Sequence, residues 1–569
     1  MSIAVDTTLA GRLRRLAEIG ALRALGEQDR DPYSPTRGCF DRRYWAWKLV
    51  DYPEATFQRH VYPLALLYKD PSSRFYQRDD LLEAIADGVR FAASIQHRNG
   101  SFDQAFPFEQ SWGATAFLLH PLLEAFELVK PAIGRDAERI AAGLATAGRF
   151  LCRHDERHGR ITNHLAGGAL SLYSAATRLN DAAFADRAGA LVGDVLATQS
   201  PEGWFPEYGG ADPGYQTLGL HYLAEIAQIA PGAALSGALD RTLEFLQWFV
   251  HPDGTFGGLY GSRRTRIAYL GGFALLAARS PLAAAMFQTL GSAAADGATV
   301  SVDTVDAGNL APVLTSLMRA AVSAPPSLAA AQALPCERPH ASCSFPQAGL
   351  YIRSATRYYA IAGSANGGTL AIFDRSSRTL VRDDGGYVGE LEDGTLVTSQ
   401  VTEAGAALNS AMVDAVDGNA MVDAVDGSAI VDAVDITTTF RRMTRLRPTP
   451  LLFLCLRLLN LTVMRSIAVG NVVKRQLVRR LMRPQAAVAL RLERRIVFGE
   501  RISVDDRIEN PDGLVLRWLR GGRPFSSIHM ASAGYYEGAA VGAQVSRGVE
   551  VDTARLARDK AITLSAQLP

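Results

Sequence analysis

The chain has 569 residues. A single hydrophobic core does not organise a chain of this length, so we expect at least two domains. Hydrophobic residues make up 48% and charged residues 21%, a composition typical of folded proteins. Lys and Arg number 59 and Asp and Glu 58, which gives a net charge of +1. This balance excludes a global field that would recruit nucleic acid, so an anionic partner must be bound locally. The five cysteines form no CxxC pair, and we predict no metal and no cofactor.

The N-terminus has no apolar segment followed by a small-residue cleavage site, so we predict no signal peptide. A cytoplasmic location follows, or a periplasmic one if the N-terminus is wrongly assigned. One apolar stretch, 451–464, is too short to span a bilayer and contains Arg457. Basic residues follow it. The segment 451–483 is therefore either a peripheral membrane contact or a helix packed on the rest of the protein.

A weak repeat organises the first half of the chain. Short turns centred on Gly100, Gly159, Gly203 and Gly254 are separated by 59, 44 and 51 residues. Each turn follows an amphipathic helical pattern and precedes a second helix rich in Ala and Gly. Helical hairpins repeating about every 50 residues must stack to bury both faces. We therefore predict an N-terminal incomplete (α/α) toroid whose turns meet at one polar, aromatic mouth.

The pattern changes after the helical repeats. Residues 1–325 form the predicted helical domain, and the Pro- and Ala-rich stretch 326–345 is predicted to be a linker. Residues 346–569 alternate apolar and polar positions and contain Gly-Gly and Asn-Gly turns, which predicts an antiparallel β-sandwich. Within it, 410–435 holds three near-identical nine-residue copies, the last one residue shorter. We interpret them as a duplicated surface insert. The predicted fold class is thus multidomain α and β.

The predicted mouth collects polar and aromatic residues at equivalent repeat positions. The candidates are Gln110 and Trp112 in the first loop, Asn163 and His164 in the second, Trp204, Glu207, Tyr208 and Tyr215 in the third, and Tyr260, Arg263 and Arg264 in the fourth. Taken singly, each of these residues could equally serve as a helix cap or a packing residue. Their recurrence is what indicates a site.

These residues resemble a known group of enzymes. Asn163-His164 before an Ala/Gly helix, Glu207-Tyr208 with Tyr215, and Arg263-Arg264 are similar to motifs of the heparinase II/III and alginate lyase group of polysaccharide lyases. That group pairs an (α/α) toroid with a C-terminal β-sandwich. The resemblance implies β-elimination on an acidic polysaccharide or oligosaccharide that contains uronate.

The resemblance also implies roles for individual residues. Asn163 would neutralise the substrate carboxylate, and His164 would neutralise it or act as the base. Tyr215 would be the acid and, depending on the face that carries the proton, also the base. Arg263 or Arg264 would hold a carboxylate. The remaining substrate-binding candidates are Gln110, Trp112, Trp204, Glu207, Tyr208, Arg264 and Tyr260, with core packing the alternative for both tryptophans.

Two other functions remain open from the sequence. A glycoside hydrolase on the same toroid would need two carboxylates about 5 to 10 Å apart. Its candidates are Asp103, Glu109, Glu207, Asp212 and Asp253. The second alternative is a non-catalytic carbohydrate-binding factor in exopolysaccharide production, because a lyase fold can persist after catalysis is lost.

Overall fold

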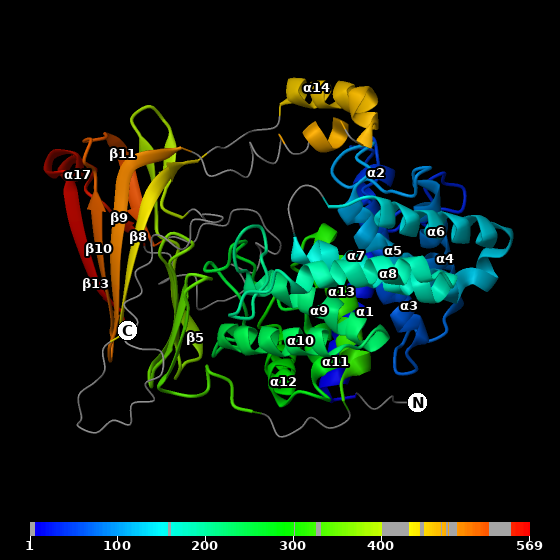
Figure 1. Ribbon diagram of the computed structural model, residues 1–569, viewed down its shortest axis with the longest axis horizontal. Coiled ribbons are helices and arrows are strands. Elements are labelled where there is room, and N and C mark those ends of the chain that lie inside the picture. Colours follow the sequence, from blue (N-terminus) through cyan, green and yellow to red (C-terminus); the bar gives the residue numbers. More distant parts are fainter. Residues whose placement is uncertain are drawn as a thin grey trace.

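The computed structural model describes residues 6–156, 161–300, 302–325, 332–400, 432–443, 449–467, 469–473, 476, 486–522 and 548–568. Helices occupy the first half and strands most of the second (Figure 1). The helices of the first half are α1 (Leu9–Glu27), α2 (Arg42–Trp45), the 3-10 helix η1 (Ala55–His60), α3 (Val61–Lys69), α4 (Asp79–Ser94), α5 (Trp112–Ile133), α6 (Ala137–Arg153), α7 (Thr162–Leu179), α8 (Ala182–Leu196), α9 (Pro213–Ile229), α10 (Ala233–Leu246), α11 (Leu270–Leu276), α12 (Pro281–Ala295) and α13 (Ala307–Ser323), with short 3-10 turns η2 (Gly134–Asp136) and η3 (Gln247–Phe249).

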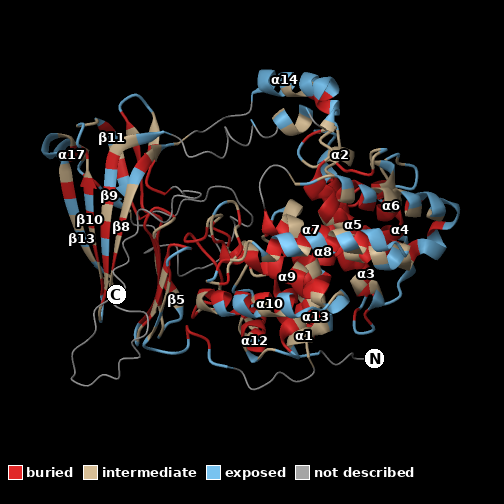
Figure 2. Ribbon diagram, viewed as in Figure 1, coloured by how far each residue is buried: buried red, intermediate tan, exposed pale blue. Residues whose placement is uncertain are grey.

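The helices alternate between an inner and an outer ring. Helices α3, α5, α7, α9, α11 and α13 pack against one another in sequence order, and α3 also packs against α13. Small residues permit this close approach. A Cβ at Gly168 of α7 would lie 2.5 Å from the ring of Trp112 on α5, so only glycine fits there. The inner helices are therefore buried on most sides, whereas the outer α6 is amphipathic, as Figure 2 shows.

The glycine turns lock each loop onto the next outer helix. Gly100 has φ +92° and Gly203 has φ +94°, a region that favours glycine. Equivalent glutamines hold the two turns: Gln96 Nε2 donates to the carbonyl oxygen of Gly100 at 3.0 Å, and Gln199 Nε2 donates to that of Gly203 at 3.1 Å. These matching bonds are the structural basis of the sequence repeat. Gly159 lies outside the described residues.

The second half contains two antiparallel sheets. The first has the order β1-β2-β3-β4-β5 and the second the order β12-β11-β6-β7-β8-β9-β10-β13. Their strands are β1 (Ala341–Phe345), β2 (Leu350–Ser354), β3 (Tyr358–Gly363), β4 (Thr369–Asp374), β5 (Thr379–Asp384), β6 (Tyr387–Leu391), β7 (Leu396–Thr398), β8 (Asp432–Arg442), β9 (Ala487–Phe498), β10 (Ile502–Glu509), β11 (Leu516–Gly521), β12 (Val549–Glu550) and β13 (Ala561–Leu568). The short helix α17 (Thr553–Asp559) packs on β11 and β13.

The five-stranded sheet lies between the helices and the eight-stranded sheet (Figure 1). One of its faces, including Ile361 of β3, joins the core of the helical half. The other face, including Ala360, packs against Ile436 of β8 and Ile496 of β9. Every residue of β3 is consequently buried. The predicted fold class, a helical toroid followed by antiparallel β sheets, is confirmed.

The apolar stretch 451–464 forms helix α14 (Pro450–Leu461) and the 3-10 turn η4 (Val463–Arg465), which lie beside the toroid (Figure 1). Arg457 pairs with Asp51 at 2.8 Å, while most leucines of α14 are exposed. Within the described ranges, no helix is both long and apolar enough to cross a membrane. Membrane contact over 451–483 stays a prediction, and within this segment 468, 474–475 and 477–483 lie outside the described residues.

Two further predictions fall partly outside the described residues. Residues 410–431 of the repeat insert 410–435 lie outside the described residues, and its last four residues are the first four of β8. Of the predicted linker 326–345, residues 326–331 are outside, and β1 begins at Ala341. The domain limits therefore stay predictions.

Candidate active site

A cavity of about 530 Å³ opens at one rim of the toroid. Asn163 and His164 line it from the first turn of α7, and Tyr215 lines it from the first turn of α9. The start of α13, with Asp306, and the segment η1, with Arg59, complete the wall. The N-terminal ends of three inner helices thus face one space. The positive ends of their helix dipoles favour an anionic ligand there.

Asn163 is held by a buried carboxylate. Its backbone N–H donates to Glu207 Oε1 at 3.1 Å, and its Nδ2 donates to Glu207 Oε2 at 2.8 Å. Glu207 is fully buried, and this burial raises the pKa of its carboxyl to about 8, against the lowering effect of the Asn163 bonds. One Nδ2 hydrogen of Asn163 is used in the bond to Glu207, and this bond fixes the orientation of the amide. The second Nδ2 hydrogen remains for a ligand.

His164 is oriented by a second carboxylate. Its Nδ1 lies 3.1 Å from Glu156 Oε2, and its ring packs edge-on against Phe117 at 4.9 Å. A carboxylate facing Nδ1 favours the tautomer that carries its proton there. The other ring nitrogen, Nε2, is then a proton acceptor. This arrangement suits a general base.

Two tyrosines, Tyr208 and Tyr215, also line the cavity, whereas the predicted catalytic residue Arg263 contacts Tyr208 and is not among the lining residues. The rings of Tyr208 and Tyr215 are 5.9 Å apart, and the guanidinium of Arg263 lies 3.9 Å from the Tyr208 ring. Burial raises the pKa of the Tyr215 phenol far above its usual value, and Arg263 opposes this only in part. Burial likewise raises the pKa of Tyr208 to about 12. Both phenols therefore carry their protons at neutral pH.

Asp212 joins the loops that present these groups. Its Oδ1 accepts a hydrogen bond from the N–H of Tyr215 at 2.9 Å and so caps α9. Its Oδ2 accepts one from the N–H of Arg263 at 2.7 Å. Tyr208 and Arg264, which flank this junction, have φ of +55° and +58°. Left-handed backbone at residues other than glycine costs about 1 to 2 kcal/mol, and here it lies beside the cavity.

The remaining predicted site residues lie elsewhere. Trp112 is 5% exposed and packs inside the helical ring. Tyr260 is buried, with its hydroxyl 2.7 Å from His251 Nε2, and Arg264 donates to the carbonyl oxygen of Gln400 in the β domain. Both residues therefore contribute to packing and to the domain interface.

Trp204 and Gln110 also make protein contacts. The indole N–H of Trp204 donates to Glu202 at 2.8 Å, and Glu202 accepts two N–H bonds from the start of the β domain, at Gln347 and Ala348. Gln110 Nε2 donates to the carbonyl oxygen of Arg465 at 2.9 Å. Neither residue lines the cavity.

Comparisons with known proteins agree with this architecture. Residues 55–275 match the family model of the ulvan lyase N-terminal domain. The resemblance to the toroid polysaccharide lyases is confirmed. The chondroitin AC lyase of Streptomyces coelicolor A3, solved in complex with chondroitin sulphate, superposes with a TM-score of 0.53 at 12% identity, over 91% of this chain and 69% of that chain.

Two other toroid lyases superpose more loosely. A Paenibacillus xanthan lyase gives a TM-score of 0.49 at 11% identity, over 91% of this chain and 47% of that chain. The heparan sulfate lyase HepC mutant of Pedobacter heparinus gives 0.41 at 10% identity, over 91% and 72%. The chain thus spans about half the length of the xanthan lyase. No curated protein matches the sequence.

The five carboxylates proposed for a hydrolase accept hydrogen bonds from groups of the toroid's own loops. Besides Glu207 and Asp212, Asp103 accepts backbone N–H bonds from Phe108 and Gln110, at 2.8 Å each. Glu109 accepts bonds from the N–H groups of Gln104 and Ala105, and Asp253 accepts one from Thr255. These side chains hold loop backbone in place. None of the five is arranged as a carboxylate pair across the cavity.

Sequence reasoning missed several residues of the wall. Arg43, Glu54 and Arg59 come from the stretch before α3, and Tyr269 precedes α11. The available signal was the repeat itself, because a further helical hairpin in that stretch would bring its connection to the same rim as the other loops. Glu156 was missed because it contacts His164 only once α6 and α7 are packed.

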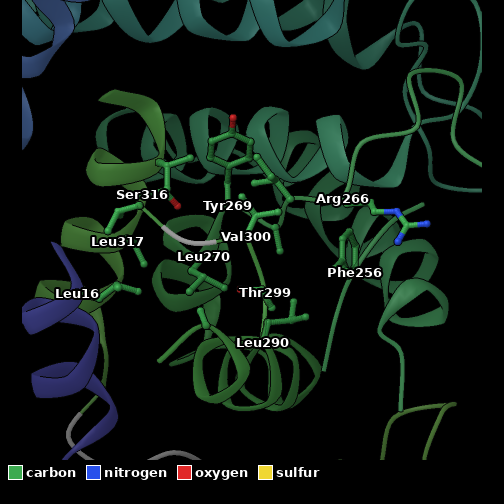
Figure 3. Close-up of a pocket in the computed structure, with 15 residues that line it drawn as sticks. Leu16, Phe256, Arg266, Tyr269, Leu270, Leu290, Thr299, Val300, Ser316 and Leu317 are labelled. Atoms are coloured by element: carbon green, nitrogen blue, oxygen red, sulfur yellow. The ribbon is translucent and has the colours of Figure 1, made fainter. Parts of the chain in front are cut away.

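A smaller cavity of about 30 Å³ lies between α1, α11, α12 and α13. Figure 3 shows Leu16, Leu270, Leu290 and Leu317 around it, with the Tyr269 ring directed away from Leu290. Its volume suits about one water molecule and no sugar. The large cavity at the rim is therefore the candidate site for a larger ligand.

Proposed function

We propose that this chain is a polysaccharide lyase that cleaves a uronate-containing glycan by β-elimination. One observation carries the proposal: an amide, an imidazole and a phenol, from Asn163, His164 and Tyr215, line a single cavity at the N-terminal ends of inner helices. The ulvan lyase domain match and the chondroitin AC lyase superposition support the enzyme class. Both names refer to enzymes of acidic polysaccharides.

The first step weakens the C5–H bond of the uronate. Its C5 proton is not acidic while the neighbouring carboxylate is ionised, because removal would add a second negative charge. The free Nδ2 hydrogen of Asn163 donates to that carboxylate, and Glu207 keeps the amide in the required orientation. The facing helix ends add further positive potential. The developing charge is then stabilised by donors already in place.

The second step removes the proton and expels the leaving group. His164 Nε2 takes the C5 proton, and the electrons of that bond form the C4–C5 double bond. The C4–O4 bond breaks, and its electron pair stays on the leaving oxygen. Tyr215 donates its phenolic proton to that oxygen, because its raised pKa keeps the proton on until this stage. Proton transfer back from His164 to Tyr215, directly or through water, restores the site.

The test is an elimination assay on a panel of acidic polysaccharides. Ulvan, chondroitin sulphate, heparan sulfate and xanthan are the first choices, since the matched proteins are named for them. Elimination produces an unsaturated uronate that absorbs in the near ultraviolet. We expect one member of the panel to give this absorbance with the wild-type protein and not with His164→Ala. Reducing ends that appear without it would instead identify a hydrolase.

A further inference from the structure

One arginine of the cavity wall has no role in the mechanism above. Arg59 belongs to η1 and is half-buried, and its guanidinium lies 5.7 Å from the centre of the Phe117 ring. The same Phe117 ring contacts His164 at 4.9 Å. Arg59 and His164 are therefore separated by no more than these two distances together. A cation stands close to the proposed base.

Arg59 lies at the inner end of the cavity. It lines the rim cavity and also a smaller one of about 30 Å³ deeper in the toroid, together with Phe117, Leu218 and Pro312. These four residues form the boundary between the two spaces. The deeper space is sized for about one water molecule, so a sugar cannot pass. The guanidinium is thus at the floor of the site, where a substituent directed into the toroid would meet it.

The hydrogen bonds of Arg59 go to backbone carbonyl oxygens and not to Glu54 or Asp306, the two acidic residues that line the same cavity. Its Nε donates to the carbonyl oxygen of Thr56 at 2.9 Å, and its Nη2 donates to that of Gly308 at 3.1 Å. In the described parts of the chain no carboxylate forms an ion pair with it, and Nη1 donates no hydrogen bond. The two carbonyls come from different elements and hold the guanidinium in a fixed position. A guanidinium that is held in this way, with Nη1 left for a ligand, suits an acidic group.

Arg43, which also lines the cavity, and Arg263, which lies beside Tyr208, differ from Arg59. Arg43 contacts two carboxylates, Asp41 and Glu54, with nitrogen–oxygen distances of 3.0 Å to each. Arg263 stacks on the Tyr208 ring. Arg59 is accordingly the cation of this wall that is best placed to bind an anion directly.

We propose that Arg59 is a specificity-determining residue that binds an acidic substituent of the polymer, a carboxylate or a sulfate ester, separate from the carboxylate held by Asn163. The assignment rests on the proposed function for the position of the cleaved sugar. It predicts that good substrates carry acidic groups on two sugars of the bound segment, or two on one sugar. A polymer with isolated uronates among neutral sugars is a poor substrate.

The experiment compares Arg59→Gln and Arg59→Lys with the wild type on the polymer identified above. Arg149→Gln is the matched control, since Arg149 is an exposed arginine on the outer helix α6 that bonds to Thr146. We expect Arg59→Gln to raise KM about tenfold or more while kcat stays within about threefold of the wild-type value. We also expect KM to depend less on salt concentration in this variant than in the wild type. Arg59→Lys keeps the charge and gives an intermediate KM. Unchanged KM in folded Arg59→Gln overturns the proposal.

Two further arms separate the possible causes. Repeating the comparison on a desulfated polymer assigns the ligand: a KM effect that persists indicates a carboxylate, and one that vanishes indicates a sulfate ester. Binding of an acidic oligosaccharide is also measured by calorimetry in the Tyr215→Phe background, with and without Arg59→Gln. Arg59-dependent binding without any elimination by the wild type refutes the proposed function and keeps this inference. If the wild type eliminates but binding does not depend on Arg59, the proposed function is kept and this inference is refuted.

Discussion

The side-chain amide of Asn163 lies 2.8 Å from Oε2 of Glu207, and both residues are almost completely buried. The pair links the first turn of α7 to the loop that presents Tyr208. Because Glu207 is buried, its pKa rises to about 8, from an ordinary value of 4.5. The residue that orients the amide therefore changes charge near the pH at which enzymes work.

Glu207 makes stability depend on pH. Between pH 4.5 and about 8 the folded state keeps a proton that the unfolded state loses, so the free energy of unfolding falls as pH rises, by at most about 1.4 kcal/mol per pH unit. Glu207→Gln removes this contribution. We expect urea denaturation to show wild type losing stability relative to the variant across that window. A constant difference between the two proteins would refute the assigned shift.

Tyr215→Phe removes the proposed acid and keeps the ring. We expect kcat to fall by about a hundredfold to ten-thousandfold, the usual contribution of a positioned general acid, because the phenol is the proposed proton donor to the leaving oxygen. Tyr173→Phe is the control, because Tyr173 is a half-buried tyrosine of α7 that does not line the cavity. Initial rates and melting temperatures of both variants are measured together. Activity in Tyr215→Phe near that of the control contradicts the role of the phenol.

Glu156 is a positioning residue, because it acts through His164. Glu156→Gln retains the size of the side chain and removes the charge that selects the tautomer of the imidazole. We expect kcat to fall about tenfold to a hundredfold with KM little changed, and the pH profile of kcat to shift. Glu138→Gln, at an exposed position of α6, is the control. A change confined to KM would mean that Glu156 acts on binding instead.

Asp212 supports two loops, so its loss is expected to cost more than that of an ordinary helix cap. Asp212→Ala leaves the buried N–H groups of Tyr215 and Arg263 without their acceptor, at roughly 2 to 5 kcal/mol of unfolding free energy. Asp181→Ala removes a cap from the outer helix α8 and is expected to cost about 1 kcal/mol. The free energies of unfolding of both variants are measured by urea denaturation and compared with that of the wild type. Equal losses would argue against the junction.

The repeat and the small-residue helices were sufficient to predict the toroid. Glycine turns such as Gly100 and Gly203 follow local rules of backbone conformation, and each is visible in a few letters of sequence. Because the hairpins stack in order, residues at the start of successive inner helices had to share a rim. Asn163 and Tyr215 were placed together by this reasoning alone.

Other features depend on contacts between distant parts of the chain. Arg264 and Tyr260 follow the same loop logic, yet the β domain covers them through Gln400 and Asn366. No local pattern indicates which loop residues a second domain will cover. Arg59 was missed for the converse reason, because its freedom from a carboxylate partner follows from the positions of all the surrounding elements.

The central claim is that bond cleavage proceeds by elimination. The most direct measurement is the mass of both products formed from a defined uronate oligosaccharide. Elimination predicts two fragments whose masses add up to that of the substrate. The double bond lies at the new non-reducing end of the fragment that comes from the reducing side of the substrate, and Tyr215→Phe forms these fragments at least a hundredfold more slowly. Fragments whose combined mass exceeds the substrate by one water molecule would contradict the claim.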